Sequence, residues 1–354
     1  MSQENQNIQE EPHKRRVRYK GKYPRNYKEK YKELNPEKYQ DTIEKVIRKG
    51  STPAGMHISI MVREIIDFLQ IKPGQTGFDA TLGYGGHTKA MLECLKGQGH
   101  MYATDVDPIE SAKTKKRLEE QGFGESILTI KLQNFCTIDE IAKEAGGFDF
   151  ILADLGVSSM QIDNPKRGFS FKVDGPLDLR LNQEAGISAA ERLDTITREE
   201  LAGMLYENSD EPYCEELAKA ITDEIRKGSR IDTTTKLREV IEKTLDFLPE
   251  KEKKDTIKKT CQRTFQALRI DVNREFEVLY EFMEKLPDAL KPGGRVAILT
   301  FHSGEDKLVK KALKEGYRAG IYADYAKDVI RPSAQECAQN GRARSTKMRW
   351  AVRA

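Results

Sequence analysis

The chain has 354 residues, enough for about two domains with buried cores. Hydrophobic residues make up 38% of it and charged residues 33%, which is polar for a globular protein but not typical of a disordered one. The net charge of +3 hides an asymmetry, because residues 1–50 contain 14 Lys and Arg against 8 Asp and Glu, and the rest is mildly acidic. A basic segment on an acidic body indicates an anionic partner.

Several classes of protein are excluded. No apolar run approaches 18 residues, so no membrane span is expected, and the N-terminus lacks the apolar segment of a secretory signal. The five cysteines are scattered without a C-x-x-C pair. We therefore expect neither a disulfide framework nor a metal site, and a cytoplasmic location.

Residues 1–50 differ from the rest of the chain. Tyrosines recur every four residues from Tyr19 to Tyr31, which would place them on one helical face, although Pro24 argues against a continuous helix. Two interpretations stay open: a solvated, flexible tail, or an arm whose Lys and Arg contact RNA phosphates while its tyrosines stack on bases.

From residue 56 onward, hydrophobic periodicity predicts alternating helices and strands. They are a helix over 57–69, a strand over 76–81, a helix over 87–95, a strand over 100–105, a helix over 108–121, a strand over 127–132, a helix over 138–144 and a strand over 148–154. This alternation predicts a parallel α/β sheet.

The pattern is interrupted by residues 163–262, where irregular loops precede three helices. These helices are predicted over 198–206, 214–227 and 234–247. A long amphipathic helix over 264–286, a strand over 295–301 and a final half-buried strand then follow. We therefore predict one α/β domain formed by residues 51–162 and 263–354, with 163–262 as an inserted, mainly helical domain.

The first candidate site is the glycine loop in Asp-Ala-Thr-Leu-Gly-Tyr-Gly-Gly-His (79–87), between a predicted strand and a helix. Asp105 ends the next strand, where a carboxylate accepts hydrogen bonds from both hydroxyls of an adenosine ribose. The loop departs from G-x-G-x-x-G, and a Pro-Gly-Gly turn at 292–294 precedes a late strand. These features favour S-adenosylmethionine as the cofactor over a nicotinamide dinucleotide.

Two further candidate sites follow predicted strand ends, where open α/β sheets bind ligands. Asp154 ends an apolar strand, and its alternative role is a helix N-cap. The irregular segment 167–180 after it is expected to shape a substrate pocket. His302 follows the strand over 295–301, although a lone histidine is more often structural than catalytic.

Seven blocks together resemble one family. They are Asp-Ala-Thr-Leu-Gly-Tyr-Gly-Gly-His-Thr (79–88), Asp-Leu-Gly-Val-Ser-Ser-Met-Gln-Ile-Asp (154–163), Arg-Gly-Phe-Ser-Phe (167–171), Asp-Gly-Pro-Leu-Asp-Leu-Arg (174–180), Thr-Phe-Gln-Ala-Leu-Arg-Ile (264–270), Phe-His-Ser-Gly-Glu-Asp (301–306) and Arg-Ala-Arg-Ser (342–345). Over residues 56–354 the chain resembles the bacterial 16S rRNA (cytosine-N4)-methyltransferase H family, also called RsmH or MraW.

The resemblance implies a Rossmann-like class I methyltransferase fold with an inserted helical domain. It implies S-adenosylmethionine-dependent N4-methylation of cytosine 1402 in 16S rRNA of the small ribosomal subunit. By motif match, the cofactor-binding residues are Gly85, Gly86, His87, Asp105, Phe135, Asp154 and Gln161. Of the catalytic candidates, Asp154 or a backbone carbonyl within 154–159 is the best placed to accept hydrogen bonds from the cytosine amine, ahead of Asp178 and His302. The target base would be splayed out of its stack.

RNA phosphates would be held by the arm, by a Lys-rich loop at 251–259 and by the basic segment 342–347. The chain departs from the family pattern in its arm, at Gly304, where the family usually has leucine, and at Lys307, where it has arginine. These departures keep three alternatives open: a non-catalytic assembly factor that retains the cofactor pocket, a shifted nucleic-acid target, and a DNA methyltransferase. The sequence leaves the oligomeric state open, a homodimer included.

Overall fold

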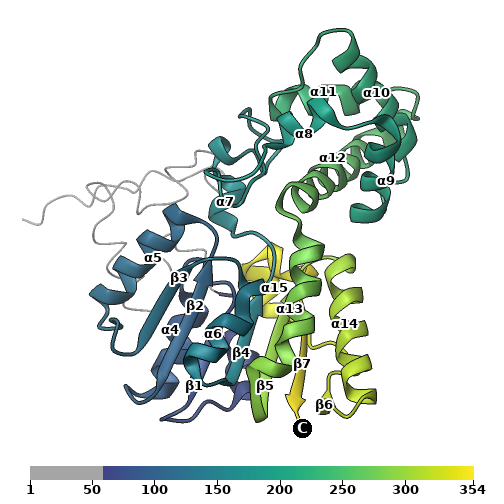
Figure 1. The fold of residues 1–354 in the computed structure, drawn as a ribbon. Coiled ribbons are helices and arrows are strands. Elements are labelled where there is room, and N and C mark those ends of the chain that lie inside the picture. The colour runs from purple at the N-terminus through teal and green to yellow at the C-terminus, as the bar shows by residue number, and fades with distance from the viewer. Residues whose placement is uncertain (1–58) are drawn as a thin grey trace, which may run out of the picture.

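The computed structural model describes residues 59–354 (Figure 1). The predicted basic arm, residues 1–50, lies outside the described residues, as does the start of the helix predicted over 57–69. The described chain has a body built on one sheet, and a helical part that rises from one end of it (Figure 1). Within residues 59–354, no helix is both long and apolar enough to cross a membrane.

The body contains one seven-stranded sheet in the order β3-β2-β1-β4-β5-β7-β6. Its strands are β1 (Thr76–Asp79), β2 (His100–Asp105), β3 (Leu128–Leu132), β4 (Phe148–Asp154), β5 (Leu290–Thr300), β6 (Tyr322–Tyr325) and β7 (Lys347–Arg353). The first five pair in parallel, whereas β7 is antiparallel to both neighbours. The strand order reverses between β1 and β4, which creates a topological switch point. This topology confirms the predicted Rossmann-like α/β fold.

Helices cover both faces of the sheet. The helices α3 (Val62–Leu69), α4 (Gly86–Leu95) and α5 (Pro108–Glu120) cover one face, and α6 (Ile138–Ala145), α13 (Glu275–Ala289) and α14 (Ser303–Arg318) cover the other. Apolar residues alternate along the central strands, so each face has its own core: Phe150 and Leu152 face α4, while Ile151 and Ala153 face α13.

The helical part has a third, separate core that runs from Phe169 to Leu268. Its helices are α8 (Ala189–Thr195), α9 (Arg198–Ser209), α10 (Cys214–Arg226), α11 (Thr234–Thr244) and α12 (Glu250–Asn273), which contributes residues from Ile257 to Val272. Capping boxes at Ser188 and Thr197 satisfy free N–H groups and fix the starts of α8 and α9. The short helices α7 (Ser159–Asp163) and η3 (Pro165–Arg167) connect this part to β4.

The structure corrects two predictions between residues 250 and 290. The single helix predicted over 264–286 is instead two helices, because Arg274 adopts a left-handed conformation with φ of 51° and ends α12. The Lys-rich loop predicted at 251–259 is the first part of α12. Lysine has a high helix propensity, so a Lys-rich segment that faces solvent can still be helical. The predicted domain boundary at residue 262 therefore falls inside a continuous helix.

Candidate functional site

A pocket of about 400 Å³ lies at the carboxyl ends of β1, β2 and β4, beside the switch point. All seven residues predicted to bind the cofactor line it: Gly85, Gly86, His87, Asp105, Phe135, Asp154 and Gln161. Residues 59–60, the end of α12 and the start of α13 complete the wall. A second cavity, of about 380 Å³, lies between α11 and α12, and none of the predicted catalytic or cofactor-binding residues lines it.

The glycine loop turns sharply between β1 and α4. Gly85 has φ of 81°, and a Cβ atom there would lie 2.7 Å from the Thr114 side chain, so both the backbone angle and the close approach require glycine. The Asp105 carboxylate fixes the loop by accepting hydrogen bonds from the N–H of Gly83 at 2.8 Å and of Asp107 at 2.9 Å. Each carboxylate oxygen keeps a free acceptor site, which suits a ligand that offers two hydroxyl donors.

Burial raises the pKa of Asp105 to about 6. The two N–H groups of Gly83 and Asp107 oppose this rise, and the negative charge of Asp107 adds to it. A carboxylate with a pKa this high gains strongly from further hydrogen-bond donors, because donors favour its charged form.

His87 and Asp154 form a pair on the floor of the pocket. His87 is buried at the start of α4, with Nε2 2.8 Å from the Ile60 carbonyl oxygen and Nδ1 3.4 Å from Asp154 Oδ2. A carbonyl only accepts, so Nε2 carries a proton and a neutral ring presents its lone pair to Asp154. The contact of 3.4 Å between Nδ1 and Oδ2 holds the two side chains together.

The other oxygen of Asp154 has no hydrogen-bond partner. Its Oδ1 atom is buried at the wall of the pocket with its acceptor capacity unused. Burial raises the pKa of Asp154 to about 6, with His87 opposing the rise and the carboxylates of Asp79 and Glu305 adding to it. An unsatisfied buried acceptor is costly, so the Asp154 carboxyl group gains strongly from any donor that a ligand in the pocket brings to it.

Gln161 reaches the pocket through a capping box. Its side-chain oxygen accepts from the N–H of Ser158 at 2.9 Å, and its amide donates to Asp107 Oδ2 at 3.0 Å. The same Asp107 oxygen accepts from the buried guanidinium of Arg167 at 2.7 Å. Arg167 also donates to the Leu181 carbonyl at 2.6 Å. This network joins the end of β2 to the segment that follows α7.

The structure does not bring Asp178 into the pocket. Its carboxylate pairs with the Arg180 side chain at 2.8 Å and accepts from Gln183, so it stabilises its own loop. The guanidinium of Arg180 and these donors outweigh burial and hold the pKa of Asp178 below its ordinary value. His302 likewise does not line the pocket; it lies behind Glu305, which does.

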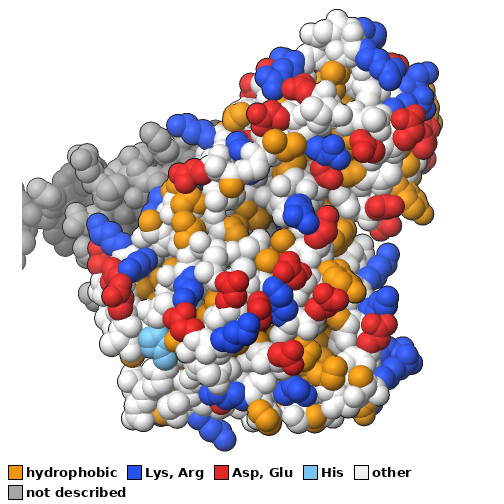
Figure 2. Space-filling model, viewed as in Figure 1, with side chains coloured by type: hydrophobic (Ala, Val, Ile, Leu, Met, Phe, Trp, Pro, Cys, Tyr) orange, Lys and Arg blue, Asp and Glu red, His pale blue; other side chains and the backbone are white. Residues whose placement is uncertain are grey.

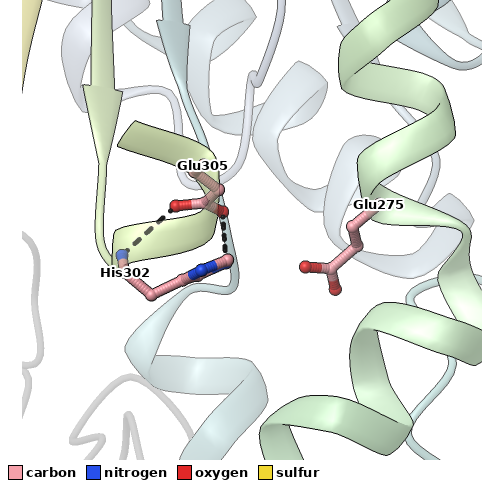
Figure 3. A group of neighbouring side chains, drawn as sticks. All are labelled: Glu275, His302 and Glu305. Atoms are coloured by element: carbon pink, nitrogen blue, oxygen red, sulfur yellow. Dashed lines mark hydrogen bonds and ion pairs between the residues drawn. The ribbon is translucent and has the colours of Figure 1, made fainter. Parts of the chain in front are cut away.

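His302, Glu305 and Glu275 lie together where α13 and α14 begin (Figure 3). One potential ligand atom from each lies within 4.8 Å of the others, the spacing of a metal site. Glu275, however, is bound bidentately by Arg269 at 2.8 Å and 2.8 Å, and Glu305 accepts from the Phe301 N–H at 2.8 Å. These protein partners already satisfy the carboxylates, and we assign the group to holding the two helix starts together.

Sequence reasoning missed the part of the pocket that comes from α12. Arg269 and Asn273 line the pocket, and Asn273 accepts from the Leu181 N–H at 2.7 Å and donates to the Leu179 carbonyl at 2.8 Å. Arg269 lies in one of the seven sequence blocks, but it belongs to a predicted amphipathic helix, and nothing in that pattern indicated a functional role. Its direct partner, Glu275, lies beyond the unpredicted break at Arg274.

Comparison with known proteins identifies the family. A model described as the MraW methylase family matches residues 54–354. The chain belongs to this family. The family predicted from the seven sequence blocks is therefore confirmed.

Named relatives match almost the whole chain. "Ribosomal RNA small subunit methyltransferase H 1" of Agathobacter rectalis is 87% identical over 346 residues, which cover 98% of this chain and 99% of that protein. "Ribosomal RNA small subunit methyltransferase H 2" of Alkaliphilus metalliredigens is 63% identical, with 98% and 99% coverage. Among solved structures, a putative rRNA-methylase from Clostridium thermocellum has 12% identity and a TM-score of 0.38, covering 82% of this chain and 92% of that one.

The match to some of these relatives extends into residues 1–50. An alignment over 346 of 354 residues necessarily includes most of residues 1–50. The relative from Fusobacterium nucleatum, at 40% identity, matches 83% of this chain, and 95% of its own length is covered. Residues 1–50 lie outside the part that the family model matches.

Proposed function

We propose that this methylase transfers the methyl group of S-adenosylmethionine to the exocyclic N4 of a cytosine in small-subunit rRNA, with cytosine 1402 of 16S rRNA as the target. The close relatives are named as ribosomal RNA small subunit methyltransferases, which supports the substrate class. Acting on the small ribosomal subunit would place the protein in the cytoplasm. The observation that carries the chemistry is the free Oδ1 acceptor of Asp154 at the switch point.

The residues of the pocket fit the cofactor. Asp105 offers the acceptor sites that a ribose needs, Phe135 would offer an aromatic ring to the adenine from the short helix after β3, and the glycine loop lets a ligand approach the backbone. When bound, S-adenosylmethionine supplies an electrophilic methyl group on a positively charged sulfur. Gly86, His87 and Gln161 would line the remaining wall.

Asp154 would orient the nucleophile. The cytosine amine is a poor nucleophile because its lone pair is delocalised into the ring. By accepting a hydrogen bond from N4–H, Oδ1 would hold the amine so that its lone pair faces the methyl carbon. Methylation leaves one excess proton on N4, and Oδ1 would accept it while the His87 Nδ1 contact holds Oδ2 in place.

The Gly304 departure does not weaken this assignment. A Cβ atom at Gly304 would lie 2.5 Å from the Phe276 ring, which itself packs edge-on against His302. Phe276 thus fills the space that a larger side chain would need, and Gly304 does not line the pocket. The non-catalytic alternative therefore gains no support from this position.

The test is to map N4-methylcytosine in small-subunit rRNA from cells with and without the gene. We expect one cytosine to lose its methyl group, and to regain it when purified protein and S-adenosylmethionine are added to the unmodified subunits. Asp154→Ala should fold and bind subunits but not restore the methyl group. Unchanged methylation in the deletion strain would refute the proposal, and binding without methyl transfer would favour an assembly factor.

A further inference from the structure

The outer face of α14 carries a stripe of basic side chains. Lys307, Lys310, Lys311, Lys314 and Arg318 are all exposed, and at 100° per residue they fall within an arc of about 100°. The opposite side of the helix carries the buried residues, from Glu305 to Gly316. In α14 the single exposed acidic residue is Glu315. We call these five residues the α14 stripe.

The α14 stripe lacks the ion pairs that the lysines of α5 form. In α5, Lys113 pairs with Glu110, Lys115 with Glu119 and Glu125, and Lys116 with Glu120. Among residues 59–354, by contrast, no carboxylate lies within 4.0 Å of a charged nitrogen of the α14 stripe. A run of unneutralised cations on one face repels itself and favours an anionic partner.

The position of α14 relates the stripe to the pocket. The first turn of the helix contributes Glu305 to the pocket wall, and the rest packs on β6, β7 and α13 as it runs away from the pocket. Figure 2 shows Lys and Arg side chains gathered along the edge of the body where α14 lies in Figure 1. From residue 307 to residue 318 the stripe extends for about 16 Å along the helix axis.

We propose that the α14 stripe binds the sugar–phosphate backbone of the substrate RNA on one side of the nucleotide that enters the pocket. The inference rests on the proposed function for the identity of the RNA and adds the surface that holds it. Long, flexible lysines spaced along a helix fit a row of phosphates, which they bind without reading sequence. The stripe thereby supplies cations to a body whose net charge is mildly acidic.

The experiment compares two triple variants with equal loss of charge. K310Q/K311Q/K314Q removes three cations of the stripe, and K113Q/K115Q/K116Q removes three from α5, at the far end of the sheet. The probe is a fluorescein-labelled single-stranded RNA with the sequence around the target cytosine, titrated at several salt concentrations. The α14 variant should lower the slope of log K against log salt by about 2, at about 0.7 per lost phosphate contact. The α5 variant should leave the slope unchanged.

A charge-conserving variant and a kinetic readout complete the test. K310R/K311R/K314R should bind like the wild type, and K310Q/K311Q/K314Q should raise KM for unmodified subunits with little change in kcat, because the stripe does not touch the reacting atoms. An unchanged salt slope in K310Q/K311Q/K314Q would overturn the proposal and assign the stripe to another acidic partner. Equal losses of RNA affinity in both glutamine variants would also overturn it. A wild type that binds RNA through the stripe but transfers no methyl group would refute the proposed function alone.

Discussion

Replacing Asp154 by asparagine should lower the rate of methyl transfer and raise the stability of the cofactor-free protein. Burial raises the pKa of this carboxyl from 3.8 to about 6, so its ionised form is disfavoured in the folded state by at most about 3 kcal/mol. Asparagine carries no charge, and its amide would still donate to His87 Nδ1. We therefore expect the free energy of unfolding at pH 8 to rise by about 1–3 kcal/mol, measured by urea denaturation.

The sign of the pH effect follows from the raised pKa. A folded-state pKa above the unfolded value means that the wild type gains stability as the pH falls from 7 through 6 towards 4, and loses it as the pH rises. The asparagine variant should lack this gain. Methyl transfer should behave oppositely: the wild-type rate should fall about tenfold per pH unit below about 6, whereas the variant should be 10²–10⁴-fold slower and without that inflection. A variant that is as fast as the wild type, or less stable at pH 8, would refute the reasoning.

Three further substitutions test the pocket. Asp105→Ala should weaken S-adenosylmethionine binding by at least about 10-fold with the fold retained, measured by calorimetry, because two acceptor sites for the ribose are lost. Arg167→Met leaves the Asp107 charge buried without its cation, and should lower the free energy of unfolding by about 3–5 kcal/mol; a loss below 1 kcal/mol would count against the network. Gly85→Ala places a Cβ atom at φ of 81° and 2.7 Å from Thr114, so it should lower the free energy of unfolding by more than about 1 kcal/mol in urea denaturation. Wild-type stability in this variant would mean that the loop moves to accommodate the methyl group.

The sequence predicted the fold class, the family and the cofactor half of the pocket well. Gly85, His87, Asp105 and Asp154 each follow or end a strand of the parallel sheet, and the topology rule places all such positions at one edge. Local signals therefore sufficed to bring them together. Their roles in binding and catalysis stay predictions until the variants are measured.

The opposite wall of the pocket could not be predicted, because it depends on contacts between distant parts of the chain. Hydrogen bonds to a loop about 90 residues earlier in the chain hold the Asn273 side chain at the pocket. The break at Arg274 has no sequence signal, since a non-glycine residue rarely adopts positive φ. Asp178 was expected in the site because it lies in the irregular segment that follows β4, but a partner two residues away, Arg180, satisfies it.

Helix α12 connects the helical part to the pocket as one continuous helix. Its 24 residues give a rod about 36 Å long, which packs in the core of the helical part through Cys261, Phe265 and Leu268 and carries Arg269 and Asn273 near its C-terminal end. The rod ends at Arg274, so a rotation of 10° there moves the far end by about 6 Å while the pocket wall moves by a fraction of that. A partner that rotates the helical part about Arg274 would thus shift these two side chains by only a small distance.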